Sequence, residues 1–225
     1  MHVVDLTQRL SSSTAVWPGG PPPSFEPVES LERDGAFSRA VTLFEHAGTH
    51  IDAPAHFVAA GVTADALSAD RLVRPFAVID VERNCRDDPD YGVTVADVED
   101  DVERRGPIVP GSIVAARTGW DRLIGSERYL GDPPRFPGFT ADAAERLVTD
   151  YGVEALAIDT PGIDPGRDSA FTVHATTTLP RGVWHIEGLV HLDRVPARGA
   201  LIVVGALPIA GASGAPARVF ALVPD

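Results

Sequence analysis

The run HAGTHIDAPAH, residues 46–56, contains three histidines and one aspartate within eleven positions. These four side chains lie at even offsets from one another: His46, His50, Asp52 and His56. In an extended chain, even offsets place side chains on one face, and the intervening residues here are mostly apolar. The pattern therefore predicts a strand that buries one face in the core and presents imidazole and carboxylate ligands to a metal ion on the other.

A helical alternative would set the first two histidines, four residues apart, on one helix face. Gly48, Pro54 and two β-branched residues disfavour a helix, and Ala47 stands where metalloprotease helices carry glutamate. Pro54 also predicts that the strand ends near Asp52 and leaves His56 on the following turn.

The composition restricts the chemistry of the site. The single cysteine, Cys85, excludes a cysteine-based zinc cluster, so any metal must have nitrogen and oxygen ligands, which suit zinc, manganese, iron or cobalt. All nineteen cationic residues are arginine, which excludes a Schiff-base lysine and a P-loop. The net charge of −13 and the absence of a basic run make a nucleic-acid partner unexpected.

The same composition predicts one soluble, cytoplasmic domain covering residues 1–225. The charged N-terminus lacks the apolar core of a signal peptide. The apolar stretch 199–217 contains Pro208 and Pro216, which favours two short buried strands over a membrane span. No linker divides the chain.

The order of strand-like and helical patterns predicts an α/β fold. Helices are expected over 94–106 and 140–152, each starting at a threonine cap, with a shorter one over 64–72. Strands are expected at 40–52, 76–82, 112–117, 155–159, 183–189, 200–204 and 218–223. Helices between strands indicate parallel pairing, whereas the last third is nearly all strand. We therefore expect a mixed sheet, or a partly closed barrel, with helices on one side.

Further ligands must come from distant parts of the chain. His174 and Glu187 are candidates, and His185 shares the strand face of Glu187. Judged by pattern alone, each is equally well explained as an ordinary polar residue at a strand end. His2 and His191 have no neighbouring candidate ligand and are expected to be ordinary polar residues.

The 46–56 run resembles the His-x3-His-x-Asp-x3-His signature of the metal-dependent cyclase-like hydrolases, the family of bacterial kynurenine formamidase and isatin hydrolase. The likeness extends to VWPGG near the start, ARTGW at 116–120, AIDTPGID at 157–164 and GALPIAGASGAPARVFALV at the end. The chain departs from the family pattern at Gly188, where we expect asparagine, and in the polar run ATTT after His174.

The resemblance implies that His46, His50 and Asp52 bind a first metal and that His56 is the catalytic acid/base. In the formamidase branch, Asp52 would bridge to a second metal held also by His174 and Glu187. The isatin hydrolase branch is similar but with a single, manganese-type ion. The family resemblance further implies a swivelling β/β/α fold, a dimer or larger homo-oligomer, and a small-molecule pocket lined by Trp17.

These residues predict hydrolysis of a small aromatic or cyclic amide. A divalent ion, zinc in the first place and manganese as the alternative, would lower the pKa of its water to about 7, and the resulting hydroxide would attack the carbonyl. Two alternatives stay open: a metal-assisted cyclase or dehydratase of polyketide type, and a metal-binding module without catalysis.

Overall fold

A computed structural model of the chain describes residues 1–225, except for the side chain of Asp87. Its strands and helices follow one another in this order: β1 (His2–Asp5), β2 (Ser24–Glu29), α1 (Leu31–Asp34), β3 (Ser38–Thr42), β4 (His50–Asp52), β5 (Val73–Asp80), α2 (Glu82–Asp87), β6 (Gly92–Val93), α3 (Val95–Arg105), β7 (Ile113–Arg117), β8 (Gly138–Phe139), α4 (Ala141–Thr149), β9 (Ala155–Ile158), β10 (Trp184–Glu187), β11 (Ala200–Ala206) and β12 (Gly214–Val223).

A closed barrel forms the centre of the molecule. Its strands are hydrogen-bonded in the order β12-β11-β5-β7-β9-β10-β4, and the ring closes because β4 also pairs with β12. The pairs β5–β7, β7–β9 and β9–β10 are parallel and the others are antiparallel, so the sheet is mixed, as predicted. Closure is complete rather than partial, which leaves these strands without a free edge.

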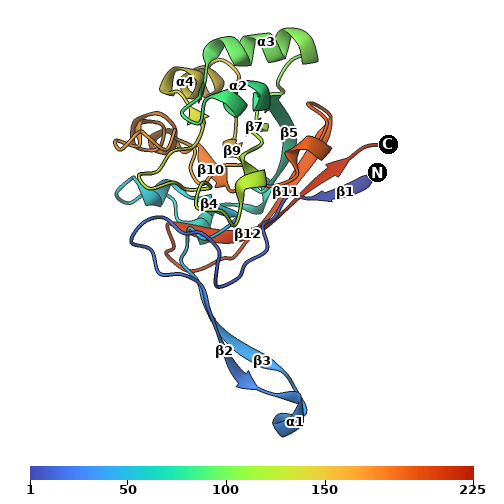
Figure 1. Cartoon of the computed structure of the whole chain (residues 1–225). Helices are drawn as coiled ribbons and strands as arrows, with labels where there is room; N and C mark the ends of the chain where they lie inside the picture. Colours follow the sequence, from blue (N-terminus) through green and yellow to red (C-terminus); the bar gives the residue numbers. More distant parts are fainter.

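The parallel strands are joined by crossovers whose helices cover one side of the barrel (Figure 1). Helices α2 and α3 lie between β5 and β7, and α4 lies between β7 and β9. Thr94 and Thr140 cap α3 and α4 with their side chains, as the sequence predicts. Helix α3 ends before Gly106. The φ of this glycine is 90°, a value that residues with a Cβ rarely adopt.

Alternation along the strands gives the barrel two apolar faces. On β7, Ile113 and Ala115 belong to the interior cluster, while Val114 and Ala116 pack beneath the helices. No helix in the described part of the chain is long and apolar enough to cross a membrane.

The prediction of one continuous strand over 40–52 was wrong. The chain leaves β3 at Thr42, passes through a turn and re-enters the sheet at His50 as β4. Gly48 has a φ of 66° in this turn, and a Cβ there would lie 2.7 Å from Leu10 Cδ2. Two short strands and a glycine turn fit the alternating pattern as well as one strand does, which is why the pattern misled.

Strands β2 and β3 form a hairpin that projects away from the barrel, with α1 at its tip (Figure 1). The short helix predicted over 64–72 is also replaced, by two 3₁₀ turns at Ala64–Ala66 and Ala69–Arg71. Ser68 between them is extended, with a ψ of 147°, and this breaks the helix.

Candidate metal centre

Strands β4 and β10 bring four polar side chains together on the outer face of the barrel. In their antiparallel register, His185 lies opposite Asp52. Two positions along, Glu187 lies opposite His50. The alternate residues of both strands point inward and join the apolar core. The polar face therefore follows directly from strand register and the two-residue period of the strands.

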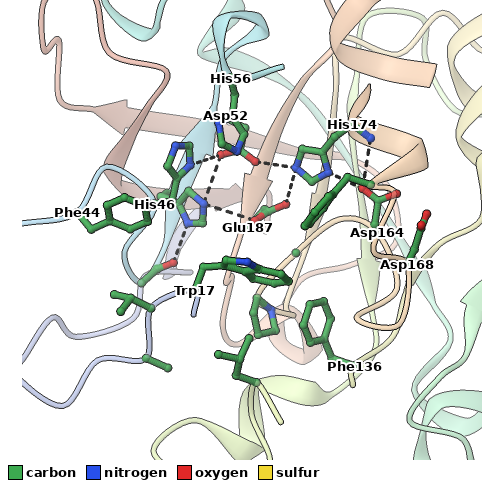
Figure 2. Close-up of a pocket in the computed structure, with 18 of the residues that line it drawn as sticks. Trp17, Phe44, His46, Asp52, His56, Phe136, Asp164, Asp168, His174 and Glu187 are labelled. Carbon is green, nitrogen blue, oxygen red and sulfur yellow. Dashed lines mark hydrogen bonds and ion pairs between the residues drawn. The ribbon is translucent and has the colours of Figure 1, made fainter. Parts of the chain in front are cut away.

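The carboxylates of Asp52 and Glu187 form the middle of this cluster (Figure 2). Oδ1 of Asp52 lies 2.6 Å from His46 Nδ1 and 3.4 Å from His50 Nε2. Its Oδ2 lies 3.0 Å from Nε2 of His174. Oε2 of Glu187 lies 3.4 Å from His50 Nε2, and Oε1 lies 3.3 Å from His174 Nε2. Each carboxylate thus faces histidines on two sides.

Hydrogen bonds behind the rings fix which nitrogen carries the proton. His50 donates its Nδ1–H to the carbonyl of Gly48 over 3.0 Å. His174 donates its Nδ1–H to the carboxylate of Asp164. In the neutral form of each ring, the Nε2 lone pair therefore faces the carboxylate pair, an assignment that follows from the partners.

His46 lies in the turn before β4, outside the strand that was predicted to carry it. Its Nε2 lies 3.1 Å from Ser213 Oγ, and that hydroxyl already donates its proton to Glu45 over 2.8 Å. His46 must therefore donate its Nε2–H to Ser213, so that in the neutral ring the Nδ1 lone pair faces Asp52.

His174 is positioned by a π-helical turn, Val173–Thr178, that packs beside α4. Such turns insert one extra residue into a helix and are frequent at functional sites. The backbone N–H of Val173 donates to Asp164, the carboxylate that also accepts from the His174 ring. One carboxylate thus fixes both the turn and its histidine.

This donor set fits a divalent ion. Ligating histidines characteristically donate their second nitrogen to a carboxylate or carbonyl, as these do. Two groups of donor atoms each lie within 4.8 Å of one another: His46, His50 and Asp52, and Asp52, His174, His185 and Glu187. Because Asp52 belongs to both, the centre has donors for one or two ions.

The buried carboxylates of the cluster favour positive charge on or between the neighbouring rings. Burial alone would lower the pKa of His50, but the hydrogen bond and the charge of Asp52 raise it to about 9. Burial would raise the pKa of Asp52, yet its hydrogen bond to His174 and those to other rings hold it well below the usual value. The carboxylates thus draw protons onto the rings unless a cation takes their place.

His56 occupies the 3₁₀ turn Pro54–His56 that follows β4, as predicted from Pro54. Its ring stacks on that of His46 with 4.0 Å between centroids. Burial lowers the pKa of His56 to about 4, and the positive charge of neighbouring imidazoles adds to this against the opposing charge of Asp52. The ring is therefore neutral at neutral pH.

A cavity of about 210 Å³ opens above the cluster. Every predicted site residue lines it: Trp17, His46, His50, Asp52, His56, His174 and Glu187. Trp17, from the segment between β1 and β2, meets Phe136 and Phe171 edge-on at 6.2 and 5.5 Å between centroids. His2 and His191, expected to be ordinary polar residues, lie outside this lining.

The sequence interpretation missed several residues of the site. Asp164 falls in the quoted segment AIDTPGID but was given no role. Phe171 has a φ of 52°, a backbone conformation that costs a bulky residue free energy and recurs at functional sites. A lone phenylalanine between Ala170 and Thr172 carries no periodic signal, so only the fold places it here.

The chain is similar to known proteins over most of its length. The model of the Cyclase family matches residues 4–165. The isatin hydrolase of Roseibium aggregatum is 31% identical to the chain, covering all of it and 92% of that protein. The kynurenine formamidase of Salinibacter ruber is 28% identical, covering 97% of the chain and 96% of that protein.

The fold is also that of solved relatives. The crystal structure of an isatin hydrolase bound to the product analogue thioisatinate superposes with a TM-score of 0.91 at 30% identity. The match covers 99% of this chain and 92% of the other.

Proposed function

The chain belongs to the Cyclase family, and from its site we propose that it is a metal-dependent hydrolase of a small, flat, uncharged amide, with a cyclic amide of the isatin type as the first candidate. The observation that carries the proposal is the Asp52–Glu187 carboxylate pair, surrounded by imidazole lone pairs at the floor of an aromatic cavity. The similarity to isatin hydrolase and to kynurenine formamidase supports amide hydrolysis.

In this proposal His46, His50 and Asp52 would hold a first ion, and Asp52, His174 and Glu187 would hold a second. Nitrogen and oxygen ligands suit zinc, with manganese as the alternative. A bound divalent ion supplies a Lewis acid that polarises a carbonyl and lowers the pKa of water to about 7.

His56 is the proposed catalytic acid/base. Its neutral ring lies beside the ligand cluster, stacked on His46, and faces the cavity. A neutral imidazole can take the proton that water loses on attack and pass it to the departing nitrogen. An amine or anilide nitrogen is a poor leaving group without that proton.

The walls of the cavity favour an uncharged aromatic substrate. Five aromatic side chains line it: Trp17, Phe44, Phe57, Phe136 and Phe171. Arginine is absent from the lining, whereas Asp164 and Asp168 are present. A substrate carboxylate would find no guanidinium to pair with among these lining residues, so a neutral lactam fits better than an amino-acid-like formamide.

The test is a product-mass screen of the metal-loaded protein in ¹⁸O-labelled water against isatins, other cyclic amides and formylated aryl amines. We expect one heavy oxygen in a ring-opened acid at each turnover, fastest for the uncharged lactams. A product formed by loss of water, or a ring closed without label, would indicate the cyclase or dehydratase instead. No turnover across the panel would favour a metal-binding module.

We also propose that the protein forms a homodimer through the β2–β3 hairpin. Four large apolar side chains on this arm are exposed: Val28 by 56%, Leu31 by 70%, Phe37 by 62% and Val41 by 51%. An isolated two-stranded hairpin is only marginally stable in water, and a second copy would cover these side chains.

A further inference from the structure

We propose that His185 is a further metal ligand, supplying Nδ1 to an ion held between Asp52, His174 and Glu187, and that Thr178 holds the His185 ring in the binding tautomer. The inference rests on the proposed metal centre and adds a ligand to it.

His185 is completely buried, with 0% of its surface exposed. Its Nδ1 has no hydrogen-bond partner among the described residues. Leaving a buried imidazole nitrogen unpaired costs on the order of 1–3 kcal/mol. A fold that keeps such an atom next to two carboxylates needs a ligand for it.

The tautomer of His185 follows from a count of protons. Thr178 Oγ1 lies 2.7 Å from the carbonyl oxygen of Val173 and 2.7 Å from His185 Nε2. The hydroxyl has one proton, and the carbonyl oxygen can only accept, so that proton goes to Val173. His185 must therefore donate its Nε2–H to Thr178, which leaves a lone pair on Nδ1.

That lone pair points into the second group of donor atoms. His185 Nδ1 lies 3.8 Å from Asp52 Oδ2, within the set whose members lie within 4.8 Å of one another. Two atoms bound to one zinc ion at about 2.1 Å can be at most about 4.2 Å apart, so 3.8 Å is compatible with a shared ion.

His185 also repeats the arrangement of the other ring ligands. One nitrogen is tied from behind, by Thr178 here as by Asp164 for His174, and the other faces the carboxylates. The π-helical turn Val173–Thr178 contains both His174 and Thr178. This turn therefore carries His174 and orients the ring of His185, which gives the polar run Ala175–Thr178 a role in the site.

The first experiment titrates zinc into the metal-free, full-length protein by calorimetry with a competing chelator. We expect two ions in the wild type. His185→Leu should leave the affinity for the tighter ion unchanged and weaken the second by about 100-fold, at or beyond the upper end of losses from outer-shell substitutions.

A matched pair of variants tests the tautomer. Thr178→Val removes the hydroxyl with little change in shape and should weaken the second ion by about 10-fold, whereas Thr178→Ser keeps the hydroxyl and should bind like the wild type. In metal-free protein labelled with ¹⁵N-histidine, long-range ¹H–¹⁵N spectra should show His185 protonated at Nε2 alone. This spectrum keeps the test decisive if His185→Leu does not fold.

Protonation of His185 at Nδ1, or unchanged binding of the second ion in both His185→Leu and Thr178→Val, would overturn the inference. The outcomes also separate it from the proposed function. Amide hydrolysis by a protein that binds one ion would leave the function intact and remove His185 from the ligands. Binding of two ions that depends on His185, without hydrolysis of any amide, would support His185 as a ligand and contradict the proposed function.

Discussion

At the scale of single residues, Asp52 is the position on which the centre depends most. Its two oxygens face different histidines, with Oδ1 toward His46 and His50 and Oδ2 toward His174. A single carboxylate that belongs to both donor groups couples their occupancy, and its loss leaves Glu187 as the carboxylate that faces Nε2 of both His50 and His174.

We expect Asp52→Ala or His50→Ala to remove the bound zinc or manganese, because each deletes a donor from the first group. Elemental analysis of the purified variants measures the effect. Full occupancy in both variants would contradict the assignment of this group as a metal site.

His56→Ala should keep the metal and lose about 100-fold or more in kcat, the scale of a positioned acid/base. Its ring stacks on a proposed ligand but is not among the grouped donor atoms. Metal content and turnover are measured on the same preparation. Normal turnover would remove the acid/base role, and loss of metal would make His56 a ligand.

Glu187→Gln should disturb metal binding more than His185→Gln. Glu187 faces His50 with one oxygen and His174 with the other, so it affects both donor groups, whereas His185 belongs only to the second. Total metal content of the two variants decides, and the opposite order would make His185 the more important ligand.

Much of the site could be predicted because ligand chemistry is local in this sequence. His46, His50, Asp52 and His56 lie within eleven residues, and Pro54 correctly predicts the turn that carries His56. The error concerned geometry. The sequence pattern placed His46 on the same strand as Asp52, whereas His46 lies in the glycine turn before β4 and contacts Asp52 from there.

At the scale of elements, the order of strand-like and helical patterns predicted a mixed sheet or partly closed barrel, and the threonine caps predicted helices α3 and α4. Pairing of β10 with β4 could not be predicted, because the two strands are more than a hundred residues apart and neither has a unique register signal. The role of Thr178 depends on the position of His185 on β10, and that of Asp164 depends on the π-helical turn that carries His174, so both were missed.

Asp159 directly follows the parallel strand β9, and its shifted pKa makes the stability of the fold depend on pH. Its buried carboxylate accepts hydrogen bonds from the backbone N–H groups of Thr118 and Gly119 and so ties the end of β9 to the segment after β7. Burial raises the pKa of Asp159 from 3.8 to about 6, although the hydrogen bonds of Thr118 oppose the shift.

Because the folded state binds this proton more tightly than the unfolded state, the contribution to stability is complete below pH 3.8 and is lost as the pH rises through about 6. Asp159→Asn lacks this titration. The free energy of unfolding of the wild type relative to Asp159→Asn should therefore fall by roughly 2 kcal/mol between pH 4 and pH 7. Urea unfolding at several pH values measures the difference, and a flat difference would contradict the shifted pKa.

At the scale of the whole molecule, the β2–β3 arm and the net charge act in opposite directions. The charge of −13 opposes association of two copies, while Leu31, Phe37 and their apolar neighbours on the arm favour it. Added salt screens the repulsion and leaves apolar burial in place, so dimerisation should strengthen between low and physiological ionic strength.

Replacing residues 25–41 by a short glycine-serine turn should yield a monomer that still binds metal, because no residue of this arm lines the cavity. Leu31→Ser and Phe37→Ser should each weaken the dimer by about 10-fold or more, the effect of losing about 1.5–3 kcal/mol of apolar burial. Sedimentation velocity over a range of concentrations measures the association. Metal content and far-ultraviolet circular dichroism provide the control that the barrel remains folded. A dimer that persists without the arm would move the interface to another surface, and a wild-type protein that stays monomeric at all concentrations would contradict the assembly.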